Sequence, residues 1–193
     1  MRKSSFFVLE GVDGVGKTTV ARKISALKGW SYVSTPSAEL KQRRSMSLRD
    51  DNGFLNLVFY LEAVVDTSAR VKKRGKKNII CDRFFPTLVV DAYERKMPGV
   101  LRILENISLE KPTLSIHLYA DYKTVKKRLK MRSHLTRDEK RLLVNRRFFD
   151  SMVSDFRELC DVEIDTSNQT VEQSVNEVLR LVSSPRVIRV VRR

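Results

Sequence analysis

The sequence predicts an α/β fold in which a central five-stranded parallel sheet carries helices on both faces. Two observations support this prediction. Short apolar runs of strand length alternate with longer amphipathic segments, and the first run leads through a glycine-rich loop into a helix. In such an order each helix returns the chain, so that the next strand runs parallel to the last. The 193 residues suit one domain over residues 1–193, because a chain of this length can bury a full hydrophobic core.

The expected strands are short runs of apolar and β-branched residues, each bounded by glycine, proline or polar turn residues. The first run precedes the glycine-rich loop, and Pro112 comes directly before the fourth. Because parallel strands bring their carboxyl ends to one edge of the sheet, we expect ligands at that edge. The strands are predicted at residues 6–10, 30–33, 78–81, 113–119 and 162–164.

Apolar residues that recur every three or four positions predict the helices. The clearest case is the long segment 54–73, in which Leu57, Leu61 and Val64 share one face. Gly29 suits the C-cap of the first helix, and Pro86 suits the first turn of a later one. The helices are predicted at residues 17–28, 38–44, 54–73, 86–96, 100–109, 123–132, 138–159 and 171–182.

A phosphate-binding loop, or P-loop, joins the first strand to the first helix. Gly11, Gly16, Lys17 and Thr18 match the pattern G-x-x-x-x-G-K-[ST] with a strand before it and a helix after it. Glycines let the backbone N–H groups turn toward phosphate oxygens, and the helix start adds its positive dipole end. The pattern predicts the three-layer fold of P-loop NTPases. The residues expected to bind ATP are Gly11, Val12, Asp13, Gly14, Val15, Gly16, Lys17, Thr18 and Thr19.

The third expected strand ends in an acid followed by a base, Asp82 and Arg83, at the same edge of the sheet. In P-loop enzymes a carboxylate at such a strand end can hold a water molecule of Mg²⁺, and the Thr18 hydroxyl can take one metal position. A guanidinium beside it can bind phosphate through two hydrogen bonds. We therefore expect Thr18 and Asp82 at a Mg²⁺ site and Arg83 on a phosphate.

The composition limits the class of protein without choosing the partner. The net charge of +15 suits nucleic acid, an anionic membrane or phosphorylated substrates. No apolar run approaches the length of a membrane span, and the sequence has no signal-peptide pattern, so we expect a soluble, cytoplasmic protein without membrane partners. Cys81 and Cys160 form no C-x-x-C pair, and we expect both to be free thiols.

Four motifs together resemble the thymidylate kinase family over roughly residues 5–182. They are LEGVDGVGKTT at 9–19, DRF at 82–84, PTLSIHLYADYKTVKKRLKMR at 112–132 and IDTS at 164–167. The resemblance implies transfer of the ATP γ-phosphoryl group to a deoxynucleoside monophosphate, with dTMP or a related pyrimidine nucleotide as the expected acceptor. It also implies Mg²⁺ as cofactor, a homodimer formed through the long helices, and a lid at about 132–140.

The resemblance also implies roles for single residues. Lys17 would bind the donor phosphates, Asp13 would approach the acceptor's sugar hydroxyl and phosphate, and Arg83 would bind that phosphate. Arg128 and Arg132 match the basic residues that lead into the family's lid, and one of them, or Arg137, would neutralise charge on the transferring group. Because the acceptor already is a phosphate oxyanion, no strong general base is expected. The catalytic set is therefore Lys17, Asp13, Asp82, Arg83, Arg128 and Arg132.

The base-recognition half matches the family less well. Phe59 lies where the family stacks an aromatic ring on the base, but Ala63, or Glu62 in a shifted alignment, stands where the family carries an arginine. Arg70 is two turns further on. Thr87 falls where the family often has serine, and Asp91 where an aromatic residue packs near the sugar. The expected acceptor-binding residues are Asp13, Phe59, Arg83, Thr87 and Asp91, and carboxylates at Glu62 and Asp91 would favour an acceptor that carries hydrogen-bond donors.

Two other functions stay open, as does a paralogue that still binds ATP but has lost activity toward free nucleotides. A nucleoside kinase would need a carboxylate base beside a neutral hydroxyl, with Glu10, Glu62 or Asp82 as candidates. A nucleic-acid-associated P-loop kinase or ATPase would account for the charge and for the basic tail at 185–193. Nucleic acid is the less favoured partner, because the basic runs carry no interleaved aromatic residues.

Overall fold

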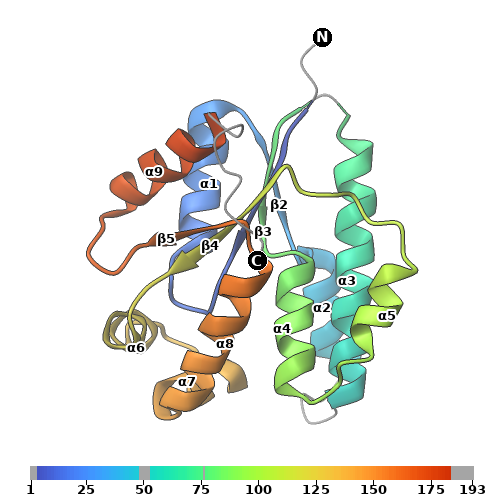
Figure 1. Cartoon of the computed structure of the whole chain (residues 1–193), viewed down its shortest axis with the longest axis vertical. Coiled ribbons are helices and arrows are strands. Elements are labelled where there is room, and N and C mark those ends of the chain that lie inside the picture. The colour runs from blue at the N-terminus through green and yellow to red at the C-terminus, as the bar shows by residue number, and fades with distance from the viewer. Residues whose placement is uncertain (1–3, 48–52, 76, 184–193) are drawn as a thin grey trace.

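The described residues, 4–47, 53–75 and 77–183 of a computed structural model, form a five-stranded parallel sheet flanked by helices (Figure 1). The strand order is β2-β3-β1-β4-β5. Register pairs include Leu9 with Asp82 between β1 and β3 and Glu10 with His117 between β1 and β4. The strands are β1 (Phe6–Glu10), β2 (Ser31–Ser34), β3 (Ile79–Asp82), β4 (Leu114–Tyr119) and β5 (Val162–Asp165).

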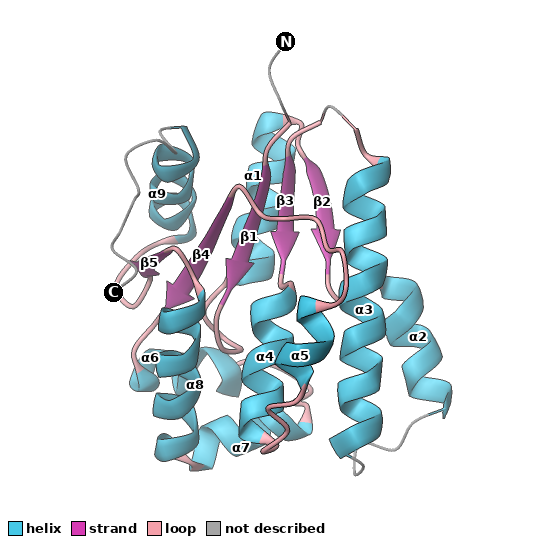
Figure 2. Cartoon of the chain, turned by 45° about the vertical axis from the view of Figure 1, so that its right-hand side comes forward, coloured by secondary structure: helices cyan, strands magenta, loops and turns pink. Residues whose placement is uncertain are grey.

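The helices lie on both faces of this sheet, as the sequence predicts. α1 and α9 pack together on one side, and α4 packs against both α3 and α8 on the other (Figure 2). The helix bounds are α1 (Lys17–Lys28), α2 (Ala38–Ser47), α3 (Gly53–Lys73), α4 (Phe85–Glu94), α5 (Val100–Glu105), α6 (Tyr122–Lys130), α7 (Arg137–Val144), α8 (Arg146–Leu159) and α9 (Val171–Ser183).

β1 is buried along its whole length, which makes it the centre of the core. Its side chains alternate between two clusters. Phe7 and Leu9 join the cluster that includes residues of α1 and α9, whereas Phe6 and Val8 join residues of α3 and α4. This placement fixes the end of β1, and with it the P-loop, at the middle of the sheet edge.

The predicted helix 138–159 is wrong in one respect, because the structure breaks it at Asn145. That residue has an extended backbone (φ −121°, ψ 95°), and its side-chain oxygen accepts a hydrogen bond from the Phe148 N–H at 2.9 Å. Asn145 is therefore the N-cap of α8 and ends α7. The helix predicted at 100–109 is also shorter and ends at Glu105, where Asn106 caps it.

The apolar residues of α3 divide between two faces, although by sequence the stripe Leu57, Leu61, Val64 and Val65 suits either the core or a homodimer. Leu57 and Val64 are buried in the core, whereas Val58 and Val65 are exposed. The predicted tail at 185–193 lies outside the described residues. Cys81 and Cys160 are both free thiols. Within the described ranges, no helix is long and apolar enough to cross a membrane.

Candidate active site

The P-loop closes tightly against the neighbouring strand and helix. Gly11 has φ +130°, and a Cβ at this position would lie 2.3 Å from the Leu118 carbonyl oxygen. Gly14 has φ +92°, and a Cβ there would lie 3.2 Å from the Leu129 side chain on α6. Both positions therefore require glycine, which explains the spacing of glycines in the motif.

Lys17, the first residue of α1, folds back over this loop. Its Nζ donates hydrogen bonds to the carbonyl oxygens of Gly11 (2.8 Å) and Val12 (2.7 Å). Burial and the neighbouring Arg83 guanidinium lower the pKa of Lys17 to about 8. The amine is thus fixed at the centre of the site, where the sequence predicts a contact with donor phosphates.

Thr18 and Asp82, the two residues that the sequence assigns to a Mg²⁺ site, lie in contact. The Thr18 hydroxyl donates to Asp82 Oδ2, and the Tyr32 hydroxyl lies 3.5 Å from the same oxygen. Asp82 Oδ1 is buried and has no hydrogen-bond partner among the residues that the structure describes. A buried carboxylate oxygen with no partner, beside a hydroxyl, fits a hard cation that prefers oxygen ligands, such as Mg²⁺.

Arg83 lies beside this pair and connects three parts of the site. It has a left-handed backbone (φ +72°), which is uncommon for a residue with a Cβ. One terminal nitrogen donates to the Gly11 carbonyl (3.3 Å) and the Thr87 hydroxyl (3.2 Å), and the other donates to Asp13 Oδ1. The guanidinium is therefore held between the P-loop and the start of α4.

The charges of this group stabilise one another. Burial opposes the ionisation of Asp13, but Arg83 and Lys17 outweigh it and lower the Asp13 pKa to about 2. Burial likewise opposes the charge of Arg83, whereas Asp13 and Asp82 raise its pKa above the usual value. Asp13 is thus an anion and Arg83 a cation throughout the neutral pH range.

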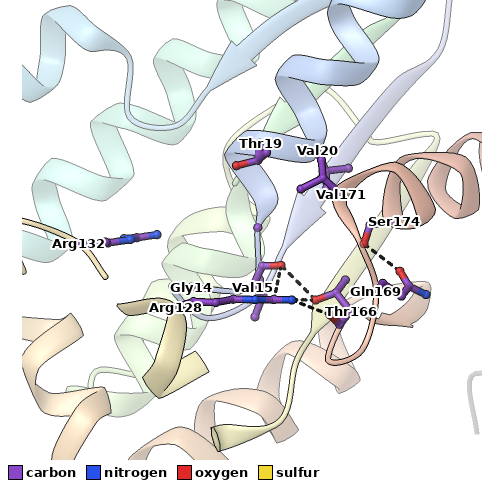
Figure 3. A pocket seen from close by; sticks show the side chains of 11 residues that line it. Gly14, Val15, Thr19, Val20, Arg128, Arg132, Thr166, Gln169, Val171 and Ser174 are labelled. Atoms are coloured by element: carbon purple, nitrogen blue, oxygen red, sulfur yellow. Dashed lines mark hydrogen bonds between the residues drawn. The ribbon is translucent and has the colours of Figure 1, made fainter. Parts of the chain in front are cut away.

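A cavity of about 250 Å³ opens beside the P-loop and the start of α1 (Figure 3). The P-loop and α1 form one wall, α6 forms another, and the segment that joins β5 to α9 forms the third. Its lining residues are Gly14, Val15, Gly16, Thr19, Val20, Arg128, Arg132, Thr166, Gln169, Val171 and Ser174. The cavity thus adjoins the expected phosphate-binding loop, as a pocket for the rest of a nucleotide would.

Arg128 and Arg132, both predicted to lie near the lid, have different environments. Arg128 donates to the Thr166 carbonyl at 2.7 Å and to the Val15 carbonyl at 3.4 Å, so it forms part of the cavity wall (Figure 3). Arg132, at the left of Figure 3, lies across the cavity from Gln169 and Ser174, is half exposed and pairs with Glu139 of α7. Arg132 also contributes to the lowered pKa of Asp13, so its charge lies near Asp13.

Asp91 pairs with Arg95 one turn along α4, with 2.8 Å between its Oδ2 and the arginine Nε. This hydrogen bond raises the pKa of Arg95. Burial raises the pKa of Asp138 at the start of α7, and Arg95, Asp91 and Asp13 all contribute to its electrostatic environment. Asp138 therefore lies near Asp13, Asp91 and Arg95, and Arg95 neutralises Asp91.

The other residues predicted for base recognition are distributed over α3. Phe59 is buried in a small cluster with Leu40 and Ala63, so position 63 is part of an apolar contact between α2 and α3. Glu62 lies on the exposed side and pairs with Arg43 of α2 at 3.4 Å.

Arg70, considered as a substitute for the family's arginine, donates to the Ser34 carbonyl (3.2 Å) and to Asp66 (3.4 Å). The structure therefore gathers the phosphate-binding residues predicted from the sequence into one site and places Phe59, Glu62 and Arg70 in other contacts.

Sequence reasoning missed several residues of the site. Thr166 and Gln169 line the cavity. Thr166 belongs to the motif IDTS, which contributes to the family resemblance but to which the sequence assigns no role. Tyr60 contributes to the raised pKa of both Arg83 and Arg95, so its hydroxyl lies near both guanidinium groups. Its position next to Phe59 on the long helix was the one available signal, since only the packing decides which of two adjacent aromatic rings faces the site.

Known proteins resemble the chain over most of its length. The model of the thymidylate kinase family matches residues 9–180. A probable thymidylate kinase of Methanocaldococcus jannaschii is 27% identical over 194 residues, covering 93% of this chain and 96% of that protein. A putative adenylate kinase of Pyrococcus furiosus is 30% identical over 180 residues, covering 91% of this chain and 83% of that protein.

Two solved structures share the fold. Thymidylate kinase from Candida albicans superposes with a TM-score of 0.74 at 16% identity, covering 95% of this chain and 93% of that chain. Deoxyadenosine kinase from M. mycoides with bound dATP superposes with a TM-score of 0.66 at 19% identity, covering 93% of this chain and 100% of that chain. The three-layer fold predicted from the P-loop is therefore confirmed.

Proposed function

This chain belongs to the thymidylate kinase family, and we propose that it is an ATP-dependent nucleoside monophosphate kinase whose acceptor is dTMP or a related pyrimidine nucleotide. Membership of the family makes it a nucleotide kinase and thus a phosphotransferase. The observation that carries the finer proposal is the placement of Arg83, which Asp13, Gly11 and Thr87 hold beside the P-loop. A fixed guanidinium next to the donor site suits an acceptor that already carries a phosphate.

The donor side supports ATP. Its phosphates would lie on the P-loop and on Lys17, and its base and sugar would occupy the adjoining cavity of about 250 Å³. Arg128 forms the floor of that cavity through its hydrogen bonds to Val15 and Thr166, and its planar guanidinium suits contact with a base.

The carboxylates near the site favour a monophosphate over a nucleoside as acceptor. A nucleoside kinase needs a base to take the proton from a hydroxyl. Of the three candidates, Glu10 is completely buried and accepts two hydrogen bonds from the start of α4, and Glu62 pairs with Arg43. Asp82 accepts from Thr18 at the proposed metal site. A phosphate oxyanion needs no such base.

Thr18 and Asp82 would hold Mg²⁺ together with donor phosphate oxygens, in keeping with the buried, unpartnered Asp82 Oδ1 among the described residues. When bound, the ion would neutralise charge on the donor phosphates.

The chain's own residues would supply positioning and charge. Lys17 would orient the donor, Arg83 would orient the acceptor, and Asp13 would keep Arg83 in place. Arg132, paired with Glu139 on α7, is the arginine best placed to neutralise the transferring group, because its charge reaches both the cavity and Asp13.

The choice of dTMP rests on the family and on the likeness to a probable thymidylate kinase. On the proposed acceptor side, Asp91 stands where the family has an aromatic residue. Arg95 neutralises the charge of Asp91. We therefore expect a substrate range that includes dTMP without being limited to it.

ATP turnover against nucleoside monophosphates, nucleosides and a short 5′-hydroxyl oligonucleotide tests the proposal, with Lys17→Ala as the blank. Preferred turnover of a pyrimidine monophosphate would support it. Turnover of nucleosides or of the oligonucleotide in the absence of any monophosphate activity would refute it. A second panel with Asp91→Phe would show whether Asp91 widens the range of acceptors. If it does, the variant should accept a narrower set of nucleotides and prefer dTMP.

A further inference from the structure

The carboxylate of Glu10, the last residue of β1, is completely buried and binds the start of α4. Its Oε1 accepts from the Phe84 backbone N–H, and its Oε2 accepts from the Thr87 hydroxyl, both at 2.6 Å. Phe84 is the N-cap of α4 and its side chain makes no capping hydrogen bond. Glu10 thus does from a neighbouring strand what the glutamate of a capping box does from within a helix.

These two hydrogen bonds hold the turn that presents Arg83. The Thr87 hydroxyl, while it donates to Glu10, accepts from Arg83 at 3.2 Å. Arg83 itself has a left-handed backbone, a conformation that persists where surrounding contacts enforce it. A continuous path of hydrogen bonds therefore runs from the buried carboxylate through Thr87 to the guanidinium.

Two cations balance the charge of Glu10. Burial raises the pKa of Glu10 to about 7, against the lowering effects of the Thr87 and Phe84 hydrogen bonds and of the Arg83 and Lys17 charges. An acceptor phosphate on Arg83 would bring negative charge close to Glu10. It would offset part of the positive charge of Arg83, which stabilises the ionised form of Glu10. A carboxyl in that position gains a proton more readily.

Three further titratable groups near Glu10 are neutral near pH 7. Burial raises the pKa values of the Cys81 and Cys160 thiols well above their usual range, and Glu10 contributes to both shifts. His117, its register neighbour on β4, is buried with its Nδ1 2.9 Å from Glu163, and burial lowers its pKa to about 4. These three groups therefore exchange no proton in the pH range where Glu10 does.

We propose that Glu10 is a positioning residue of the acceptor site, which holds Arg83 through the start of α4 and takes up a proton when an acceptor phosphate binds to Arg83. This inference rests on the proposed function. The proton comes from the solvent and forms an O–H bond on the carboxylate, which can then donate to Thr87. Loss of the negative charge weakens the attraction between Glu10 and Arg83 and leaves the guanidinium to the phosphate.

Calorimetric titration of the intact protein with nucleoside monophosphates, dTMP among them, tests this. At pH 7, titrations in two buffers of different ionisation enthalpy give the number of protons taken up on binding. We expect up to about 0.5 proton for the wild type, because a group with a pKa near the working pH is about half protonated before binding. The isosteric Glu10→Gln variant should lack this uptake, while proton exchange by the nucleotide phosphate itself is common to both proteins.

A second pair of variants tests the path through Thr87. Thr87→Val removes the hydroxyl at nearly constant volume and should raise the KM for the acceptor about tenfold, with the KM for ATP unchanged. Thr87→Ser, which restores the hydroxyl, should reverse most of that rise. A role limited to the stability of the fold would instead change both KM values together.

The outcomes separate the two proposals. If monophosphates bind but wild type and Glu10→Gln take up the same number of protons, the inference is overturned and the proposed function stands. If no monophosphate binds to the wild type, the proposed function fails, and the inference fails with it.

Discussion

Replacement of Gly11 by alanine should disturb both halves of the site at once. At φ +130° an L-residue is strained by about 1–3 kcal/mol, and the new Cβ would lie 2.3 Å from the Leu118 carbonyl oxygen. Backbone atoms cannot rotate away as a side chain can, so the loop must move. The Gly11 carbonyl accepts hydrogen bonds from Lys17 and Arg83, and its displacement would misplace together the two cations that we propose bind the donor and the acceptor.

Gly29 provides a matched control. It also has a positive φ, +64°, but a Cβ there would meet nothing within 4 Å, so Gly29→Ala should lower the free energy of unfolding by about 1 kcal/mol. For Gly11→Ala we expect the free energy of unfolding to fall by about 3 kcal/mol or more, because the backbone strain and the close contact with Leu118 add together. For a chain of this size these values correspond to Tm decreases of about 2–4 °C and about 6–12 °C.

Thermal unfolding with and without ATP measures both effects. Gly29→Ala should keep the rise in Tm that ATP produces in the wild type, whereas Gly11→Ala should lose most of it. Equal Tm values for the two variants, together with an equal effect of ATP, would refute the reasoning about close packing at Gly11.

Four further predictions follow from single contacts. Asp82→Asn should raise the Mg²⁺ concentration for half-maximal turnover by about 10- to 100-fold. Tyr32→Phe removes a 3.5 Å contact to the same carboxylate and should raise that concentration far less. Equal effects of the two variants would contradict the metal assignment. Asn145→Ala should lower the free energy of unfolding by about 1 kcal/mol, seen as a Tm decrease of about 2–4 °C, and an unchanged Tm would argue against its role as a cap. The Tm of Glu10→Gln should rise relative to that of the wild type between pH 4.5 and about 7, because ionisation of a buried carboxyl with a raised pKa destabilises the folded wild type. Parallel plots of Tm against pH for the two proteins would speak against this. If the exposed face of α3 forms the expected homodimer, Val58→Glu should convert it to monomers in sedimentation, and an unchanged mass would exclude that face.

Local sequence was sufficient for the main elements of the fold. The bounds of β1 and α1 agree with the prediction, because an uninterrupted apolar run, a glycine-rich loop and a glycine C-cap each act within a few residues. The break at Asn145 was missed, since apolar periodicity continues across it and the cap depends on a single side chain turning to the Phe148 N–H.

For the site, the sequence by itself determined that the P-loop and the pair Asp82 and Arg83 meet at the sheet edge. The P-loop motif and the strand ending in Asp82 and Arg83 have to converge there, because parallel strands bring their carboxyl ends together.

Only the tertiary structure decided how those residues are used. It buried Phe59 against Leu40 and paired Asp91 with Arg95. It also connected Glu10 to Arg83 through Thr87, which lies 77 positions from Glu10 and 4 positions from Arg83 in the sequence. The orientation of a side chain and the charge it meets depend on which elements pack around it, and no local pattern carries that information.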